Sequence, residues 1–334
     1  MEKSMFKLIL IRFSIMMSVS LVLIVSSVLI AYFPPSKFDY DNESFNFRLN
    51  PTYNETQFNI VFDQHSHTKY SDGVLTVEQN ILWHLAHGFN AMALTDHNTM
   101  KGMDEYDTLA TKYDGQIILL NGMEWTTSRI HLNLLGITEL VPIPTSNPSD
   151  TQIQAAIDAT HDQGGVVVVD HIPWSLPRMP DHPTRAQLLD WGVDYIEMVN
   201  EWIYDTDSES WCNDTGGFGQ ITGTDMHHPM KVWGWTLMNA QNFTAEGVME
   251  QLLARNTTIL YDSVGQNDQS EAVPSARYKI VKPFVSLGAH FIPTNSFVDW
   301  QAFGIAISYF VVGFIIIEAS VIGIKKRRKR KNIE

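Results

Sequence analysis

Cysteine is nearly absent from this sequence, since Cys212 is the only one in 334 residues. A single thiol excludes an intramolecular disulfide, and it excludes a metal site built from several thiolates. Nothing beside Cys212 in the sequence would activate its thiol, so we do not expect a cysteine nucleophile. Any metal ion in this protein must therefore be held by histidine and carboxylate side chains.

Positive charge is scarce in the middle of the chain. The formal net charge is −14, and one run at 325–331 consists entirely of lysine and arginine. An acidic central region without a basic patch argues against nucleic acid as a partner. It does not argue against small phosphate esters, because bound divalent cations reverse the local charge. The sequence identifies no protein partner.

Two long stretches are almost free of charged residues. Arg12 is the only charged residue in 8–33, and Glu318 is the only one in 303–324. Each stretch exceeds the roughly 20 residues that cross a bilayer as a helix, so we expect two membrane spans. A cleaved signal peptide is the alternative for the first stretch, although its apolar run is longer than usual and no small-residue cleavage pattern follows. Glu318 is costly in lipid and indicates a partner helix, an ion path or a side chain that reaches the interface.

The basic residues predict how these spans are oriented. Lys3, Lys7 and Arg12 flank or enter the first span and the 325–331 run follows the second, so the positive-inside rule places both termini in the cytoplasm. The region between the spans is then extracellular or lumenal, and the basic tail contacts anionic lipid of the bilayer. Glycosylation sequons agree with an outward-facing domain. They begin at Asn42, Asn54, Asn213, Asn242 and Asn256.

This organisation predicts five segments along the chain. They are a cytoplasmic N-terminus with a span at 1–33, a stalk at 34–58, an extracytoplasmic domain at 59–300, a second span at 301–324 and a basic cytoplasmic tail at 325–334.

Short apolar runs alternate with helix-like stretches inside the predicted domain. The apolar runs are 59–62, 91–94, 117–120, 166–169, 195–199 and 220–223. The helix-like stretches are 76–87, 100–113, 130–136, 151–163 and 245–255. Thr76 with Gln79 has the pattern of a capping box, which favours a helix there. The alternation predicts an α/β fold with largely parallel strands, and 262–274 is expected to be a loop.

Histidines and carboxylates repeatedly follow the predicted strands. His65 and His67 come after the first strand and point to the same side of an extended segment. The carboxyl ends of barrel strands meet at one rim, where such side chains converge. Burying them is costly without a metal or a charge partner, so the pattern predicts a metal site. The full set is His65, His67, Asp72, Asp96, His97, Glu124, His131, Asp170, His171, Asp225 and His227.

The order of these pieces resembles the motifs of the PHP (polymerase and histidinol phosphatase) superfamily. The resemblance covers about 59–230 and rests on His65-Ser66-His67, Ser71-Asp72-Gly73, Thr95-Asp96-His97, Gly122-Met123-Glu124, His131, His171 and Gly223-Thr224-Asp225-Met226-His227. The Ser71-Asp72-Gly73 piece is similar to a subgroup in which aspartate replaces a histidine. The resemblance implies a distorted, TIM-like (β/α)7 barrel with two or three divalent metal ions. Nitrogen and oxygen ligands suit Mn, Zn or Fe.

The resemblance also implies a role for each residue. One ion would be surrounded by His65, His67, Glu124 and Asp225. Glu124 would bridge to a second ion on His131 and His171, and a third would lie on Asp72, His97 and His227. Asp96 is expected to orient a ligand imidazole. A hydroxide held at Glu124, His131 and His171 is the expected nucleophile.

The expected function is hydrolysis of a phosphomonoester or phosphodiester, either a small molecule or one borne by a membrane. Metal-dependent hydrolysis of a carboxyl or carbamate ester is an alternative, and a non-catalytic surface-binding module is another. Arg178 and Arg129 are expected to bind the substrate phosphate, with solvated surface charges as the competing interpretation. Trp125, Trp174 and Trp202 lie near motif ends, where they either wall the pocket or pack into the core.

Overall fold

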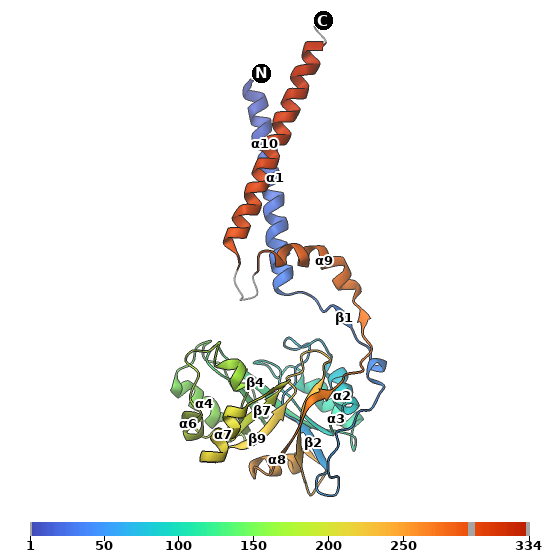
Figure 1. Ribbon diagram of the computed structural model, residues 1–334, viewed down its shortest axis with the longest axis vertical. Coiled ribbons are helices and arrows are strands. Elements are labelled where there is room, and N and C mark those ends of the chain that lie inside the picture. The colour runs from blue at the N-terminus through green and yellow to red at the C-terminus, as the bar shows by residue number, and fades with distance from the viewer. Residues whose placement is uncertain (1, 293–297, 332–334) are drawn as a thin grey trace. The chain divides into compact units, whose positions relative to one another are not determined.

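A computed structural model describes residues 2–292 and 298–331, and the chain divides into two compact units (Figure 1). One unit is Tyr40–Ala272 and contains the predicted α/β domain. The other combines the two ends of the chain, up to Asp39 and from Val273 onward. Each unit is described separately below.

A ten-stranded sheet curled into a half-barrel forms the centre of the Tyr40–Ala272 unit. The strand order is β11-β10-β2-β3-β4-β5-β6-β7-β8, and β9 pairs with β7. The strands are β2 (Ile60–Asp63), β3 (Ala91–Leu94), β4 (Ile118–Thr126), β5 (His131–Leu135), β6 (Val166–Val169), β7 (Tyr195–Asn200), β8 (Ile203–Tyr204), β9 (Gly219–Gly223), β10 (Val232–Met238) and β11 (Thr258–Gln266).

Parallel and antiparallel pairs alternate in blocks around this sheet. β2, β3 and β4 are parallel neighbours, and so are β6, β7 and β9. β5 joins the two blocks through antiparallel pairs with β4 and β6, and β10 pairs antiparallel with β2 and β11. The α/β class is confirmed, and the curled sheet is consistent with a barrel of the expected type. The carboxyl ends of the two parallel blocks come to one rim.

One predicted element is wrong. Residues 130–136 were expected to be helix-like but contain strand β5, whose five residues are all buried. The strand forms a hairpin with the extended β4 and is covered on both faces. A short, fully buried apolar run has no alternation that separates a strand from a helix, and here pairing with β4 and β6 decides the outcome.

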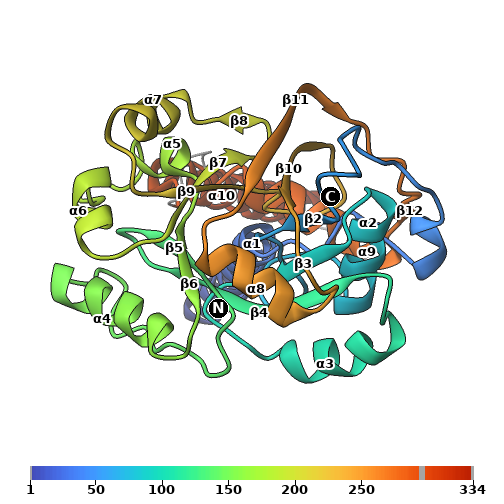
Figure 2. The same cartoon turned by 90° about the horizontal axis from the view of Figure 1, so that it is seen from below.

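Helices form at four of the five helix-like stretches, and three further helices of this unit were not predicted. Gln79 N donates to Thr76 Oγ1 (3.2 Å) and Thr76 N donates to Gln79 Oε1 (3.0 Å), so the predicted capping box begins α2. Figure 2 shows α3, α4 and α8 around the outside of the sheet. The helices are α2 (Val77–Ala86), α3 (Met103–Lys112), α4 (Asp150–His161), α5 (Ile172–Ser175), α6 (Arg185–Asp190), α7 (Thr206–Thr215) and α8 (Ala245–Leu253), with a 3-10 turn η1 (Asn42–Phe45).

Most of the predicted stalk belongs to the domain. Residues 40–58 lie in the same compact unit as the sheet, and Phe45 is only 3% exposed. Phe45 belongs to a core cluster with Val61, Trp83 and Trp235. Aromatic residues in this segment therefore pack over β2 and α2 instead of crossing solvent. At the other end the compact unit stops at Ala272, and the predicted loop at 262–274 begins as the last part of β11.

The second unit contains α1 (Glu2–Tyr32), α9 (Ala276–Ala289) and α10 (Trp300–Lys331), with β1 (Phe38–Asp39) paired to β12 (Val273–Pro274). Within it, Met5–Tyr32 and Trp300–Lys325 are long and apolar enough to cross a membrane. Length and composition alone do not distinguish a span from a signal sequence or a core helix.

An ion pair links α1 to α10. Arg12 Nε and Nη2 donate to the two carboxylate oxygens of Glu318 at 2.6 and 2.7 Å. The rings of Phe13 and Phe314 also meet, with centroids 5.1 Å apart. The partner of Glu318, which the sequence left open, is therefore the first apolar helix of the same chain.

We predict that Phe45→Ala lowers the free energy of unfolding by about 3–5 kcal/mol, because it removes a buried ring from a packed cluster. Denaturant unfolding of the full chain in detergent, followed by tryptophan fluorescence, measures this. Phe243→Ala is the matched control in the same unit, since Phe243 is 38% exposed and its loss should change stability by less than about 0.5 kcal/mol. Equal effects of the two changes would contradict the packing of residues 40–58.

Candidate metal centre

The rim of the sheet brings all nine predicted ligands together. Their ligand atoms fall into overlapping groups, and within each group the atoms lie within 4.8 Å of one another. His131 joins through Glu124, with Nδ1 2.6 Å from Oε1. The groups are His67, Asp72, His97 and His227; His65, Glu124 and His171; and His65, His67 and Asp225.

Glu124, on β4, lies between two sets of imidazoles and is fully buried. Its Oε1 faces His131 Nδ1 (2.6 Å) and His171 Nε2 (3.5 Å). Its Oε2 faces His97 Nδ1 at 2.8 Å and both His65 Nε2 and His67 Nε2 at 3.3 Å. One carboxylate can therefore serve two neighbouring cations, one on each oxygen.

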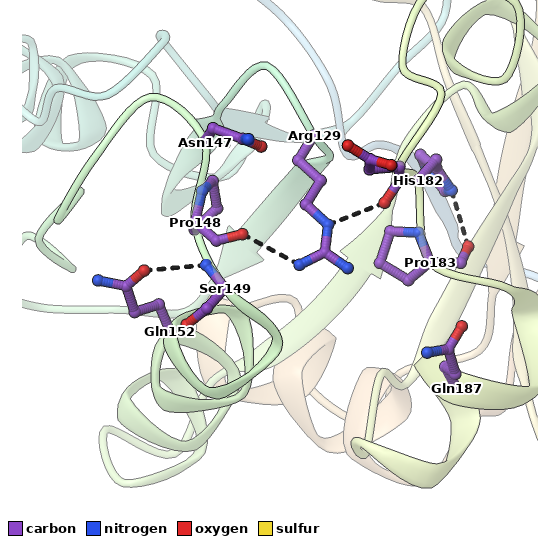
Figure 3. Close-up of a pocket in the computed structure, with 9 residues that line it drawn as sticks. Arg129, Asn147, Pro148, Ser149, Gln152, His182, Pro183 and Gln187 are labelled. Atoms are coloured by element: carbon purple, nitrogen blue, oxygen red, sulfur yellow. Dashed lines mark hydrogen bonds between the residues drawn. The ribbon is translucent and has the colours of Figure 1, made fainter.

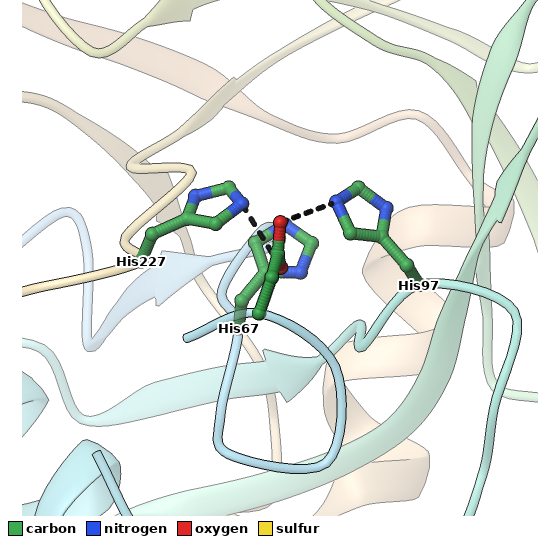
Figure 4. A group of neighbouring side chains, drawn as sticks. His67, His97 and His227 are labelled. Atoms are coloured by element: carbon green, nitrogen blue, oxygen red, sulfur yellow. Dashed lines mark ion pairs between the residues drawn. The ribbon is translucent and has the colours of Figure 1, made fainter. Parts of the chain in front are cut away.

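A second carboxylate gathers the outer histidines. Asp72 Oδ1 lies 3.2 Å from His227 Nε2, and Asp72 Oδ2 lies 3.6 Å from His97 Nε2. Figure 4 shows the rings of His97 and His227 on either side of His67, whose centroid is 4.4 and 4.2 Å from theirs. The Asp72 side chain is 57% exposed, so this group opens to solvent while the Glu124 group is closed.

Orphaned atoms show that this cluster fits cations. The 2.6 Å approach of His131 Nδ1 to Glu124 Oε1 lacks hydrogen-bond geometry, and within the described residues neither buried atom has a hydrogen-bond partner. His67 Nδ1 is also buried and unpaired there. Buried lone pairs without donors are costly, and a divalent ion would satisfy several of them at once. Imidazole and carboxylate donors match zinc, manganese or iron.

The electrostatics of the site also favour a bound cation. Burial opposes ionisation of Glu124, but His97, together with His131 and His171, holds the pKa of its carboxyl well below the usual range. Burial also opposes a charge on His65, yet Asp225 and Glu197 raise the pKa of its imidazole well above the usual value. A site that draws a proton onto a fully buried imidazole will draw a divalent cation in its place.

Part of this chain also matches a known protein family. Residues 63–164 match the family model described as the PHP domain. The match begins at Asp63, at the end of β2, and includes six of the nine predicted ligands, up to His131. The other three, His171, Asp225 and His227, lie beyond it.

Individual proteins match this chain only over part of its length or at low sequence identity. A 5′-3′ exoribonuclease of Haemophilus influenzae is 36% identical over 89 residues, covering 25% of this chain, so the chain spans about a third (32%) of that protein. A two-domain protein from Bacteroides vulgatus, containing a predicted PHP-like metal-dependent phosphoesterase, superposes with a TM-score of 0.52 at 21% identity, covering 65% of this chain and 68% of its own. A lesion-specific endonuclease of Pyrococcus furiosus gives 0.42 at 13% identity, covering 60% and 57%. At this identity the Bacteroides structure supports the fold alone.

Glu197 is the main residue of the site that the sequence did not predict. It is 1% exposed on β7. His65 Nδ1 lies 3.0 Å and Gln64 Nε2 2.8 Å from its Oε1, while the backbone N of His171 donates to its Oε2 (2.7 Å). A proton held on His65 Nδ1 leaves Nε2 directed at Glu124 and Asp225. A charged residue inside the apolar strand 195–199 was the available signal.

Two aspartates hold the loops that carry the ligands. Asp63 accepts from the backbone N of Thr224 (2.9 Å) and contacts His84 Nε2 (2.8 Å), so His84 supports the rim from α2. Asp96 was expected to orient an imidazole. In the structure it accepts from Thr68 N (2.7 Å) and Ser71 Oγ (2.6 Å), which fixes the loop that carries Asp72.

Asp170 lies beside His65 in the same buried layer. Its side chain is inaccessible to solvent, and neither carboxylate oxygen has a hydrogen-bond partner among the described residues. Its Oδ1 is 3.8 Å from His65 Nδ1. Burial, reinforced by Glu197 and Glu124, raises the pKa of Asp170 well above the usual value. Asp170 thus lies behind the ligands as a buried carboxyl group whose surroundings oppose its ionisation.

Backbone strain is concentrated at the same rim. Asn98, His171, Glu201 and Asp225 adopt positive φ angles of 54°, 28°, 48° and 53°, and each follows the end of a strand. Such conformations cost about 1–3 kcal/mol each for non-glycine residues. They turn the chain sharply at the strand ends, and two of the four residues are predicted ligands.

The predicted substrate-binding arginines differ in availability. Arg129 donates to Asp181 O (2.8 Å), Pro148 O (3.0 Å) and Asp150 Oδ1 (2.5 Å), so its guanidinium joins two loops at a cavity of about 460 Å³ (Figure 3). Arg178 stacks its guanidinium on Trp174, with Cζ 4.6 Å from the ring centroid.

The three tryptophans named in the sequence analysis also differ in position, and only one of them borders the site. The Trp174 ring is 38% exposed and lies 5.1 Å from His171 and 5.7 Å from His131, centroid to centroid. Trp174 therefore walls the site, with Arg178 beside it. Trp125 is fully buried in the core, and Trp202 is 58% exposed against Trp233.

We predict that Glu197→Gln weakens metal binding about 10–100-fold, because the amide cannot hold the proton on His65 Nδ1 as the carboxylate does. Metal titration of the stripped protein, followed by calorimetry, measures this. Glu250→Gln, at an exposed position of α8, is the control and should bind metal normally. Unchanged affinity in Glu197→Gln would remove Glu197 from the site.

The outer group predicts how stability depends on pH in the metal-free protein. Although burial opposes the charge, Asp72 raises the pKa of His227 to about 8, and Glu124 with Asp72 raises that of His97 to about 10. Both values lie above the unfolded value of about 6.5. The stabilisation is therefore complete below about pH 6.5 and is lost as pH rises through these folded-state values.

After discounting for solvent, the loss by pH ~8.5 from His227 is about 1 kcal/mol, or about 2–4 °C in unfolding temperature. Scanning calorimetry of metal-stripped protein should show this fall, and it should be shallower in Asp72→Asn. Metal affinity should change in the opposite direction and rise with pH, because the imidazoles must lose their protons to bind. A stability that rises between about pH 6.5 and 8.5 would contradict the assignment.

Proposed function

We propose that this chain is a metal-dependent phosphoester hydrolase. The observation that carries the proposal is the buried Glu124 carboxylate, which faces imidazoles on both oxygens inside a PHP domain. Bound divalent ions would supply Lewis acidity toward the ester oxygens and an activated water. The proposed sites are those expected from the sequence, with His65, His67 and Asp225 on one side of Glu124 and His131 and His171 on the other.

The remaining residues of the rim position these groups and the substrate. Asp72, His97 and His227 form the solvent-facing group, which is the proposed third site. Glu197 and Asp63 hold the inner imidazoles and loops in place. Trp174 borders His131 and His171, and Arg178 lies over its ring, so the proposed phosphate contact is Arg178. Arg129 is a weaker choice because its donors already have protein acceptors.

The proposed substrate is a small or membrane-borne phosphate ester. The net charge of −14 and the lack of a basic patch in the central sequence disfavour long polyanions. A short ester needs only the cations and one neighbouring arginine. Nucleolytic activity is described for the Haemophilus relative, and short nucleotides therefore belong in the substrate panel.

We propose further that the chain is anchored by two spans, with both termini cytoplasmic and the PHP domain outside or in a lumen. Met5–Tyr32 and Trp300–Lys325 have the required length and composition. The Arg12–Glu318 pair joins them, which reduces the charge that lipid would meet. All five sequon asparagines are exposed, as glycosylation of an outward-facing domain requires.

The test is hydrolysis of phosphomonoesters, phosphodiesters and carboxyl esters by the full chain loaded with Mn, Zn or Fe. We expect turnover of phosphate esters that a chelator abolishes. His65→Ala combined with His67→Ala should lower kcat/KM by at least about 10³ and reduce bound metal, because it removes two ligands of the central site.

The control is His161→Ala, at an exposed histidine outside the cluster, which should retain activity and metal. Asp72→Asn changes a proposed ligand at a half-exposed position, so it tests the site with less risk of misfolding than the double variant. Turnover of carboxyl esters alone would overturn the phosphoesterase proposal. Full metal loading without any turnover would favour a binding module.

A further inference from the structure

Helix α9 belongs to the unit that contains the candidate spans and lies across α1 (Figure 1). The two helices touch backbone to backbone where Gly288 meets α1. A Cβ atom on Gly288 would lie 1.9 Å from Ser27 O and 2.7 Å from Ala31 Cβ. The C-terminal half of α9 is therefore docked near the end of the first apolar helix.

The rest of α9 presents two different strips to its surroundings. Ile280, Phe284 and Leu287 are spaced as one helical face, and Ile280 and Phe284 are 75% and 37% exposed. Lys279 and Lys282, both exposed, lie on a different side of the helix. One charged residue, Arg277 in the first turn, lies on the apolar side. Its side chain is long enough for the guanidinium to reach an interface.

The apolar strip faces the body of the candidate span. Phe284 lines a cavity of about 410 Å³ with residues of α1 that precede the crossing point. They are Ser18, Val19, Val22, Leu23 and Ser26. Since the crossing is at Ser27 and Ala31, Phe284 extends from α9 toward the middle of α1, and the lysine side of α9 is turned away from it.

Proline in α9 agrees with this orientation. Pro283 has no backbone N–H, so the carbonyl of Lys279 lacks its usual partner within the helix. An unpaired carbonyl is tolerated toward water or headgroups and is costly in hydrocarbon. The open carbonyl thus belongs to the residue that carries a charged side chain.

Aromatic residues also gather at the start of α10. Backbone N of Asp299 donates to Phe291 O (2.6 Å), and Phe291 and Trp300 both contact Phe303 with centroids 5.9 Å away. Trp300 is 73% exposed. Tryptophan at the end of an apolar helix is typical of the membrane–water boundary.

We propose that α9 lies in the plane of the membrane surface, with Ile280 and Phe284 among lipid acyl chains and Lys279 and Lys282 among anionic phospholipid headgroups. The apolar slot between α1 and α9 is then filled by acyl chains. This proposal rests on the proposed membrane anchoring by α1 and α10. It makes the segment after the domain a third membrane contact, which binds the surface without crossing it.

The experiment uses the full chain with Cys212→Ala, reconstituted into vesicles, with one environment-sensitive label at a time. Labels are attached at Val22→Cys, Ile280→Cys, Lys282→Cys and Lys101→Cys, all exposed positions. Vesicles contain phosphatidylcholine alone or with phosphatidylglycerol, and carry spin labels on acyl chains or on headgroups. Quenching of each label reports its depth.

We expect the acyl-chain probe to quench the Val22 and Ile280 labels, with Ile280 about 5–10 Å below the headgroup boundary. The Lys282 label should respond mainly to the headgroup probe, and the Lys101 label in the PHP domain to neither. Phosphatidylglycerol should increase quenching at Ile280. Lys279→Glu with Lys282→Glu should abolish that increase, whereas Lys69→Glu with Lys101→Glu should leave it intact.

Two outcomes would overturn the proposal and are distinguishable. If the Val22 label is quenched while the Ile280 label remains open to an aqueous quencher, α9 does not enter the membrane although the anchoring stands. If the Val22 label also escapes the acyl-chain probe, the anchoring itself fails and the role of α9 fails with it.

Discussion

The buried carboxylate of Glu124 is the group on which the rest of the site depends. Five imidazoles, those of His65, His67, His97, His131 and His171, lie within 3.5 Å of its oxygens. A negative charge with no exposure to solvent requires compensating positive charge close by, and protons or metal cations are the available sources. The strand ends around Glu124 supply side chains that can hold either protons or metal cations. The folding of the rim and the chemistry of the site therefore both require positive charge beside this carboxylate.

A second layer keeps this arrangement in place. Glu197 reaches both His65 and the backbone of His171, and Asp63 joins the end of β2 to Thr224 and His84. These contacts connect strands that are distant in sequence. They also offset the strained backbone at His171 and Asp225, because hydrogen bonds over-determine the conformation of each loop.

The sequence predicted the parts of this protein that have a local signature. Motif order identified the nine candidate ligands that the structure gathers at one rim, and Thr76 with Gln79 marked the start of a helix. Strand β5 was missed because a short buried run looks the same in either conformation. Glu197 was missed because its role depends on pairing between β6, β7 and β9, and residues 40–58 were taken for a stalk because their aromatic side chains pack against residues far along the chain.

The pair formed by Arg12 and Glu318 has a consequence for how the protein is made. Its two members are separated by 306 positions, so in the proposed arrangement Arg12 enters the membrane long before its partner is synthesised. A chain that ends before the second span then keeps an uncompensated arginine in lipid. Completion of the second span would therefore neutralise the charge that Arg12 places in the first.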